Sequence, residues 1–149
     1  NEIVDRNYGP IDFPIFRYAD VLLMWAEALN EDGKLNEAIA KVNEVRQRAG
    51  VAQLNSNAAT AVGGKDDLRL RIRNERRVEF PNEGINYFDE LRWGTWKEKV
   101  FQAGNGRKQV WGTNVGNYSY KGDFLNVWPI PTSEIQMNVN LVQNPGWID

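Results

Sequence analysis

The 149-residue sequence contains no cysteine and no histidine. Without cysteine there is no disulfide framework and no thiol nucleophile, and without histidine there is no Ser-His-Asp triad and no zinc finger. The 18 basic residues nearly balance the 20 acidic ones, which leaves a net charge of −2. Such a charge gives no general attraction toward nucleic acid or anionic lipid, so nucleic acid is not expected as a partner. No apolar run reaches the ~18 residues of a membrane-spanning helix, and no motif calls for a metal or a cofactor.

Aromatic residues are what the sequence has in quantity: six Trp, five Tyr and six Phe, or 11% of the chain. A length near 150 fits one domain, large enough to bury about 70% of the surface that the unfolded chain exposes. The question is therefore which aromatic side chains pack in this core and which remain for a ligand.

Apolar periodicity predicts a mainly α-helical fold. We expect helices over about residues 16–31, 35–49, 66–80 and 85–100, and a short one from Glu134. The first helix is apolar on two faces, so we expect it to lie between neighbours. Gly33 and Gly50 are placed to end the first two helices, and Gly94 can end the first part of the fourth.

The first two predicted helices form a hairpin with a tetratricopeptide-like pattern of small and packing residues. A single repeat cannot bury its own face, so the hairpin must pack with further helices. The residues that carry the pattern are Ala26, Leu29, Gly33, Ala38, Val42 and Val45.

Charged residues occupy packing positions on two of the predicted helices. Glu75 and Glu79 share a stripe with Leu68 and Ile72, and Arg46 lies in the apolar stripe of the second helix. An unpaired buried ion costs several kcal/mol. We therefore predict a structural ion-pair cluster in which Arg46 meets Glu75 or Glu79. The open alternative is a catalytic carboxylate pair acting on a glycosidic bond.

The region 101–128 combines glycines with aromatics and is predicted to be an irregular loop region with short strands. Alternation favours strands at residues 108–111, 118–121 and 125–130. Trp128, beside a Pro-Ile-Pro motif, is expected in the core.

Four side chains of this loop region are candidates for carbohydrate binding: Trp111, Asn114, Tyr118 and Tyr120. Aromatic rings stack on the apolar C–H faces of sugars, and amides hydrogen-bond the hydroxyls. The alternative is that these aromatics close the core beside a helix layer.

Five segments follow one another in a distinctive order. They are Phe16–Asn30, Val42–Gly50, Glu75–Phe80, Glu83–Gly94 and Trp128–Trp147. Each is weak alone, but in this order and spacing they cover nearly the whole chain apart from two loops. With them the chain resembles the SusD/RagB family, the surface glycan-binding lipoproteins of the Bacteroidetes.

The resemblance implies a mainly helical fold with tetratricopeptide-like helix pairs. It also implies a non-catalytic protein on the outer membrane that binds oligosaccharides and passes them to a TonB-dependent transporter of the SusC type. Because family members are much longer, residues 1–149 are expected to form a single C-terminal domain of a longer protein, with the lipid anchor outside this chain. Much of the family's sugar platform lies upstream, so the quoted motifs are mainly scaffold. The alternative function is a tetratricopeptide-like scaffold that binds a protein partner and no sugar.

Overall fold

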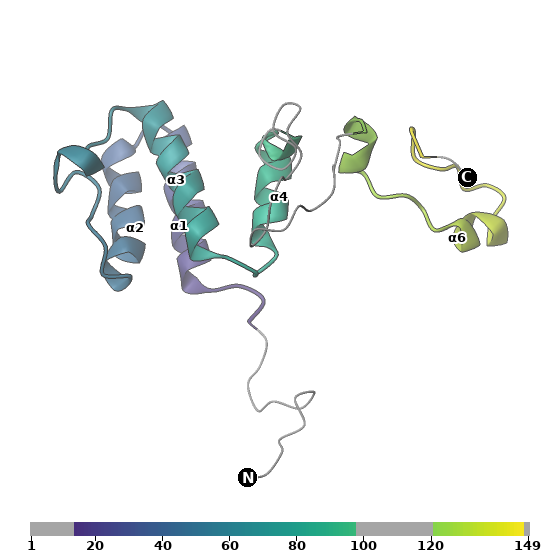
Figure 1. Cartoon of the computed structure of the whole chain (residues 1–149), viewed down its shortest axis with the longest axis horizontal. Coiled ribbons are helices and arrows are strands. Elements are labelled where there is room, and N and C mark those ends of the chain that lie inside the picture. The colour runs from purple at the N-terminus through teal and green to yellow at the C-terminus, as the bar shows by residue number, and fades with distance from the viewer. Residues whose placement is uncertain (1–13, 98–120, 148–149) are drawn as a thin grey trace, which may run out of the picture. The chain divides into compact units, whose positions relative to one another are not determined.

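The computed structural model describes residues 14–97 and 121–147 (Figure 1). These ranges are mainly helical and contain no strand, which confirms the predicted fold class. The chain divides into two compact units, residues 1–83 and 84–149, and each is described by itself. That residues 1–149 act as a single domain stays a prediction. No helix within the described ranges has the length and apolar character needed to cross a bilayer.

The first unit is a three-helix arrangement. It contains α1 (Tyr18–Glu31), α2 (Leu35–Arg48), the 3-10 helix η1 (Ala58–Thr60) and α3 (Lys65–Glu79). Helix α1 contacts both α2 and α3, and α2 also contacts α3. Figure 1 labels the three helices. The hairpin predicted from the small residues is therefore present, and α3 covers part of it.

The core of this unit lies where the three helices meet. The small residues Ala26 and Ala38 are fully buried, which lets α1 and α2 approach closely. Helix α1 has α2 and α3 as neighbours, as its two apolar faces led us to expect. Its second face stays partly exposed within the first unit, with Val21 41% and Trp25 50% exposed. The buried apolar residues are Ala19, Leu22, Leu23, Ala26, Leu29, Ala38, Val42, Val45, Leu54, Leu68, Ile72 and Phe80.

Gly33 makes the turn between α1 and α2. Its φ of +80° lies in the left-handed region. The N–H of Gly33 donates to the carbonyl of Asn30, and the N–H of Lys34 donates to the carbonyl of Leu29. These two bonds satisfy carbonyls in the last turn of α1. A residue with a side chain is strained in this conformation, so the sequence needs glycine here.

We expect Gly33→Ala to destabilise the first unit by about 1 kcal/mol, because a left-handed backbone conformation is unfavourable for alanine. The added Cβ itself would meet no neighbouring atom. Gly63→Ala is the matched control, because Gly63 has no positive φ and an added Cβ would make only ordinary contact with Asp67. Chemical denaturation of both variants checks this. An equal effect of the two substitutions would contradict the conformational argument.

The second unit contains α4 (Ile85–Arg92), the 3-10 helix η2 (Asp123–Asn126) and α6 (Thr132–Met137). Helix α4 ends well before residue 100, because Gly94 adopts a φ of +68° directly after the capping residue Trp93. The strand predicted at 125–130 is wrong, because a 3-10 helix occupies its start. The strand predicted at 108–111 lies outside the described residues, and so does all but the last residue of the one predicted at 118–121. Helix α6 starts directly after Pro131, two positions earlier than expected.

Candidate functional site

The four predicted sugar contacts, Trp111, Asn114, Tyr118 and Tyr120, lie outside the described residues. Their role stays a prediction. Two other features of the described chain have the geometry of a site: an ion-pair cluster with an adjoining groove in the first unit, and an aromatic groove in the second.

Arg46 and Glu75 are brought together between α2 and α3. The Nη1 atom of Arg46 donates to Oε2 of Glu75 at 2.5 Å, and its Nε donates to the carbonyl of Ala52 at 2.7 Å. The Glu75 side chain is only 8% exposed. Arg46 thus neutralises a carboxylate that the helix packing has removed from water.

Glu79 is not bound to Arg46 but to two other arginines, Arg17 and Arg48. Arg17 donates from Nη1 to Oε1 of Glu79 at 2.9 Å and from Nη2 to its backbone carbonyl at 2.9 Å. It also binds Glu83 through two bonds of 3.0 and 2.8 Å. Arg17 therefore ties the start of α1 to the end of α3, a role that sequence reasoning missed.

The arginines shift the pKa values of these carboxyl groups. The hydrogen bond from Arg17 lowers the pKa of Glu83 and outweighs the opposing effect of burial. Burial raises the pKa of Glu79, but the hydrogen bonds from Arg48 and Arg17 outweigh it and lower the pKa overall. Both groups are therefore ionised near neutral pH. A general acid for glycoside cleavage needs a raised pKa, so this environment does not favour the catalytic alternative for Glu79.

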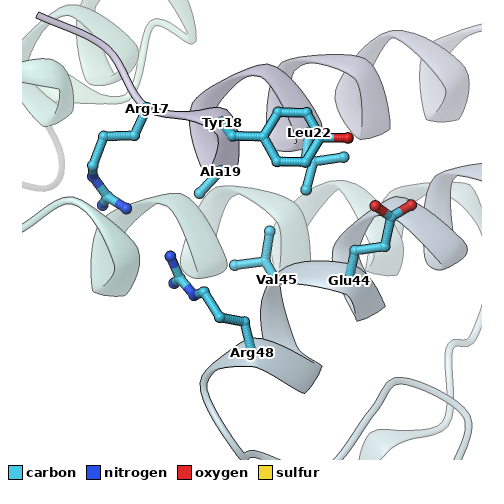
Figure 2. Close-up of a pocket in the computed structure, with 7 residues that line it drawn as sticks. All are labelled: Arg17, Tyr18, Ala19, Leu22, Glu44, Val45 and Arg48. Carbon is cyan, nitrogen blue, oxygen red and sulfur yellow. The ribbon is translucent and has the colours of Figure 1, made fainter.

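A groove of about 460 Å³ opens beside this cluster, between the start of α1 and the end of α2 (Figure 2). Figure 2 shows Arg17 and Arg48 on one side of it and Glu44 on the other, with Val45 between them. Both arginines bind Glu79, so their charges are already paired. The lining residues are Arg17, Tyr18, Ala19, Leu22, Glu44, Val45 and Arg48.

A second groove, of about 380 Å³, lies in the second unit and is lined by aromatic and apolar residues. Trp128 is 75% exposed in it, so its expected place in the core is wrong for the described chain. The lining residues that belong to the described ranges include no carboxylate and no basic side chain. They are Tyr87, Leu125, Trp128, Pro129 and Trp147.

Side-chain hydrogen bonds brace the backbone that carries Trp128. Asn144 Nδ2 donates to the carbonyl of Trp128 at 2.7 Å, and Trp147 Nε1 donates to that of Val127 at 2.8 Å. Gln143 accepts from the N–H of Ile130 at 2.8 Å and donates to its carbonyl at 2.9 Å. The exposed indole therefore sits on a backbone fixed on both sides.

An ion pair between Arg69 and Glu31 joins α3 to the end of α1. The Nε atom of Arg69 donates to Oε1 of Glu31 at 2.6 Å, and its Nη2 atom donates to Oε2 at 2.8 Å. This hydrogen bonding lowers the pKa of Glu31 from 4.5 to about 2, against a smaller opposing effect of burial. A carboxylate with a lowered folded pKa stabilises the fold above its unfolded pKa, and this contribution is lost as the pH falls to the folded value.

We expect Arg69→Gln to be less stable than the wild type at pH 7. The difference should shrink as the pH falls below about 4.5 and disappear only below about pH 2, where Glu31 becomes protonated in both folded proteins. The free energy of unfolding, measured across this pH range, checks the prediction. A difference that does not change with pH would show that Arg69 stabilises by packing alone.

Comparisons with known proteins agree with this architecture. The model of the SusD family matches residues 1–147. A SusD-like protein of Formosa agariphila is 34% identical over 95% of this chain and 26% of its own length. The starch-binding protein SusD of Bacteroides thetaiotaomicron is 31% identical over 94% of this chain and 22% of its own length.

Solved structures show the same likeness. A SusD-like protein from Bacteroides fragilis superimposes with a TM-score of 0.69 at 32% identity, over 89% of this chain and 25% of that one. A SusD superfamily protein from Bacteroides vulgatus superimposes with a TM-score of 0.67 at 28% identity. The match covers 89% of this chain and 27% of that one. The chain thus spans about a quarter of the length of these relatives. Its order of motifs, its helical fold and these matches agree, and the chain belongs to the SusD family.

Proposed function

We propose that this chain is part of a glycan-binding component of an outer-membrane uptake complex, which captures oligosaccharides and passes them to a TonB-dependent transporter of the SusC type. The observation that carries the proposal is the match of the SusD family model to residues 1–147. A relative named as a starch-binding protein, aligned over most of this chain, supports the sugar as ligand.

The sugar-contact candidates Trp111, Asn114, Tyr118 and Tyr120 remain part of this proposal. Their residue types fit the task, because ring faces stack on sugar C–H groups while amide and hydroxyl groups bond to sugar hydroxyls. The location that we propose is the outer-membrane surface, with a lipid anchor outside this chain.

The component would act without catalysis. The sequence has no histidine and no cysteine, which removes two common catalytic groups. The carboxylate pair considered for glycoside cleavage is engaged elsewhere, since Glu75 binds Arg46 and Glu79 binds Arg17 and Arg48. These contacts support a structural role for both residues.

The test of sugar binding uses the complete gene product and a panel of soluble polysaccharides. Affinity electrophoresis should show retardation by at least one of them, and calorimetry should give its affinity. No release of reducing sugar is expected from the bound polysaccharide. A folded protein that binds none of the panel would contradict the glycan proposal, and steady release of reducing ends would contradict the non-catalytic one.

The proposed delivery step has its own test. The complete gene is co-expressed with a SusC-type transporter gene of the same organism, and the tagged transporter is purified from the outer membrane in detergent. We expect the complete gene product to co-purify in a stoichiometric complex. Purification of the transporter alone, with both proteins present in the membrane, would contradict docking.

One observation favours the alternative of a protein-binding scaffold. One face of α1 exposes large apolar side chains, with Tyr18 70%, Met24 47% and Trp25 50% exposed. Exposed apolar patches often mark protein contacts. If the complete gene product binds a protein through this face and no glycan of the panel, the scaffold function replaces the proposed one.

A further inference from the structure

The aromatic groove of the second unit has an arrangement that packing alone does not explain. Trp128 is one of two tryptophans in its lining, and 75% of it is exposed. Leaving an indole in water forgoes the stabilisation that its burial would give. A ring kept exposed on a fixed backbone is suited to a ligand.

The backbone around the indole is already ordered by its own contacts. Asn144, Gln143 and Trp147 each donate a side-chain hydrogen bond to a carbonyl between Val127 and Ile130. A site ordered before binding loses little conformational entropy when the ligand arrives. The bracing therefore raises the affinity that one exposed ring can give.

The second ring of the groove is fixed as well. Tyr87 on α4 packs edge-to-face with Phe88 and Trp96, with centroid separations of 5.3 and 5.8 Å. Its hydroxyl oxygen accepts from Nε1 of Trp128 at 3.4 Å. The phenolic proton can then be donated to a ligand oxygen at the rim. The groove thus offers ring faces with a hydrogen-bond donor beside them.

The chemistry of the lining selects the class of ligand. None of the five described lining residues carries a carboxylate or a basic group, so these residues offer no ionic partner to a phosphate, a uronic acid or a charged peptide. Its volume of about 380 Å³ lies at the small end of the ~300–1,000 Å³ typical of ligand pockets. Flat apolar faces and one hydroxyl suit the C–H face of a neutral sugar ring.

We infer that the groove of Tyr87, Trp128 and Trp147 is a stacking subsite for one neutral pyranose ring of a bound glycan. Trp128 supplies the stacking face, and Tyr87 supplies the hydrogen bond that orients the ring. This inference rests on the proposed glycan-binding function and adds a specific subsite to it. Its residues differ from the four sugar-contact candidates Trp111, Asn114, Tyr118 and Tyr120.

The first test compares two tryptophan variants of the complete gene product. Trp128→Ala is expected to lower the affinity for a neutral polysaccharide such as starch about tenfold, which corresponds to the loss of one stacked ring. Trp128→Phe keeps a ring and should stay within about threefold of the wild type. Trp25→Ala is the matched control, because Trp25 is an exposed indole in the first unit that lies over Lys41. Its affinity should be unchanged.

A second test needs no variant and covers the case in which Trp128→Ala does not fold. Hydroxyl-radical footprinting with mass spectrometry should show that Trp128 is oxidised in the free protein and protected by the neutral polysaccharide. Oxidation of Trp25 should be the same in both states.

The outcomes separate the inference from the function on which it rests. If the wild type binds no glycan, the proposed function fails. If the wild type binds glycan but Trp128→Ala binds equally well, the subsite is wrong and the function stands. If Trp128 is protected from oxidation without any glycan, another part of the protein covers the groove, and the subsite is again wrong.

Discussion

Arg46→Met should destabilise the helical unit by about 3 kcal/mol. The variant keeps most of the volume of the side chain but leaves the Glu75 carboxylate, only 8% exposed, without its cationic partner. Removing one member of a buried pair costs more than the pair itself contributes, because the remaining charge has neither water nor a counterion. Loss of the bond from Arg46 Nε to the Ala52 carbonyl adds to the effect by freeing the chain that follows α2.

Arg48→Met is the matched control for this result. Arg48 lies on the same helix, but its side chain is 54% exposed, and its partner Glu79 keeps Arg17 when Arg48 is removed. We expect a loss below about 1 kcal/mol. The double variant Arg46→Met with Glu75→Leu should regain most of the stability, since it removes both charges together. Urea unfolding of the variants measures all three values, and equal losses for Arg46→Met and Arg48→Met would contradict the burial argument.

The helical framework could be read from the sequence because local patterns determine it. The apolar stripes of α1, α2 and α3 follow the helical period, and their predicted ends agree with the structure to within two residues. Gly33 and Gly50 both adopt positive φ values at the predicted helix ends. These signals need only neighbouring residues, so no knowledge of the tertiary fold is required.

Contacts between distant residues were harder to predict. The position of Arg46 in an apolar stripe predicted an acidic partner, and in the structure Arg46 binds Glu75. Arg17 gave no such signal, because it precedes its helix and belongs to no stripe. Its bonds to Glu79 and Glu83 span more than 60 positions of sequence and depend on how α1 packs against α3.

The aromatic groove shows a different limit. The alternation of residues 125–130 favoured a strand, but a strand forms only beside a partner, and the described residues provide none. A 3-10 helix therefore begins this stretch. The side chains of Asn144 and Gln143, from a later part of the chain, bind the backbone of Trp128 and Ile130. Periodicity around Trp128 could not reveal them.

Phe80→Ala should have the largest effect on the first unit, a loss of about 4 kcal/mol. Phe80 directly follows α3 and is 1% exposed, so alanine would leave a cavity in the core. The guanidinium carbons of Arg17 and Arg76 lie 4.9 and 5.3 Å from the centre of its ring. Alanine would therefore also lose two cation–π contacts, because the guanidinium groups lie over the negative π face of the ring.

Two controls separate these contributions. Phe80→Leu keeps an apolar side chain but removes the ring, so it should cost about 1–2 kcal/mol. Phe16→Ala removes a ring that is 70% exposed, one position before Arg17, and should cost less than about 1 kcal/mol. A loss for Phe80→Ala no larger than that for Phe16→Ala would contradict the place of Phe80 in the core.

A double-mutant cycle between Phe80→Leu and Arg17→Met then measures how the ring and the ion-pair cluster depend on each other. We expect the two losses to be non-additive by about 1 kcal/mol, because the ring supports the same guanidinium that binds Glu79 and Glu83. Additive losses would mean that the ion pairs alone position Arg17. Coupling would mean that the apolar core and the charged cluster at the end of α3 form one stabilising unit, and that the groove beside Tyr18 owes its shape to both.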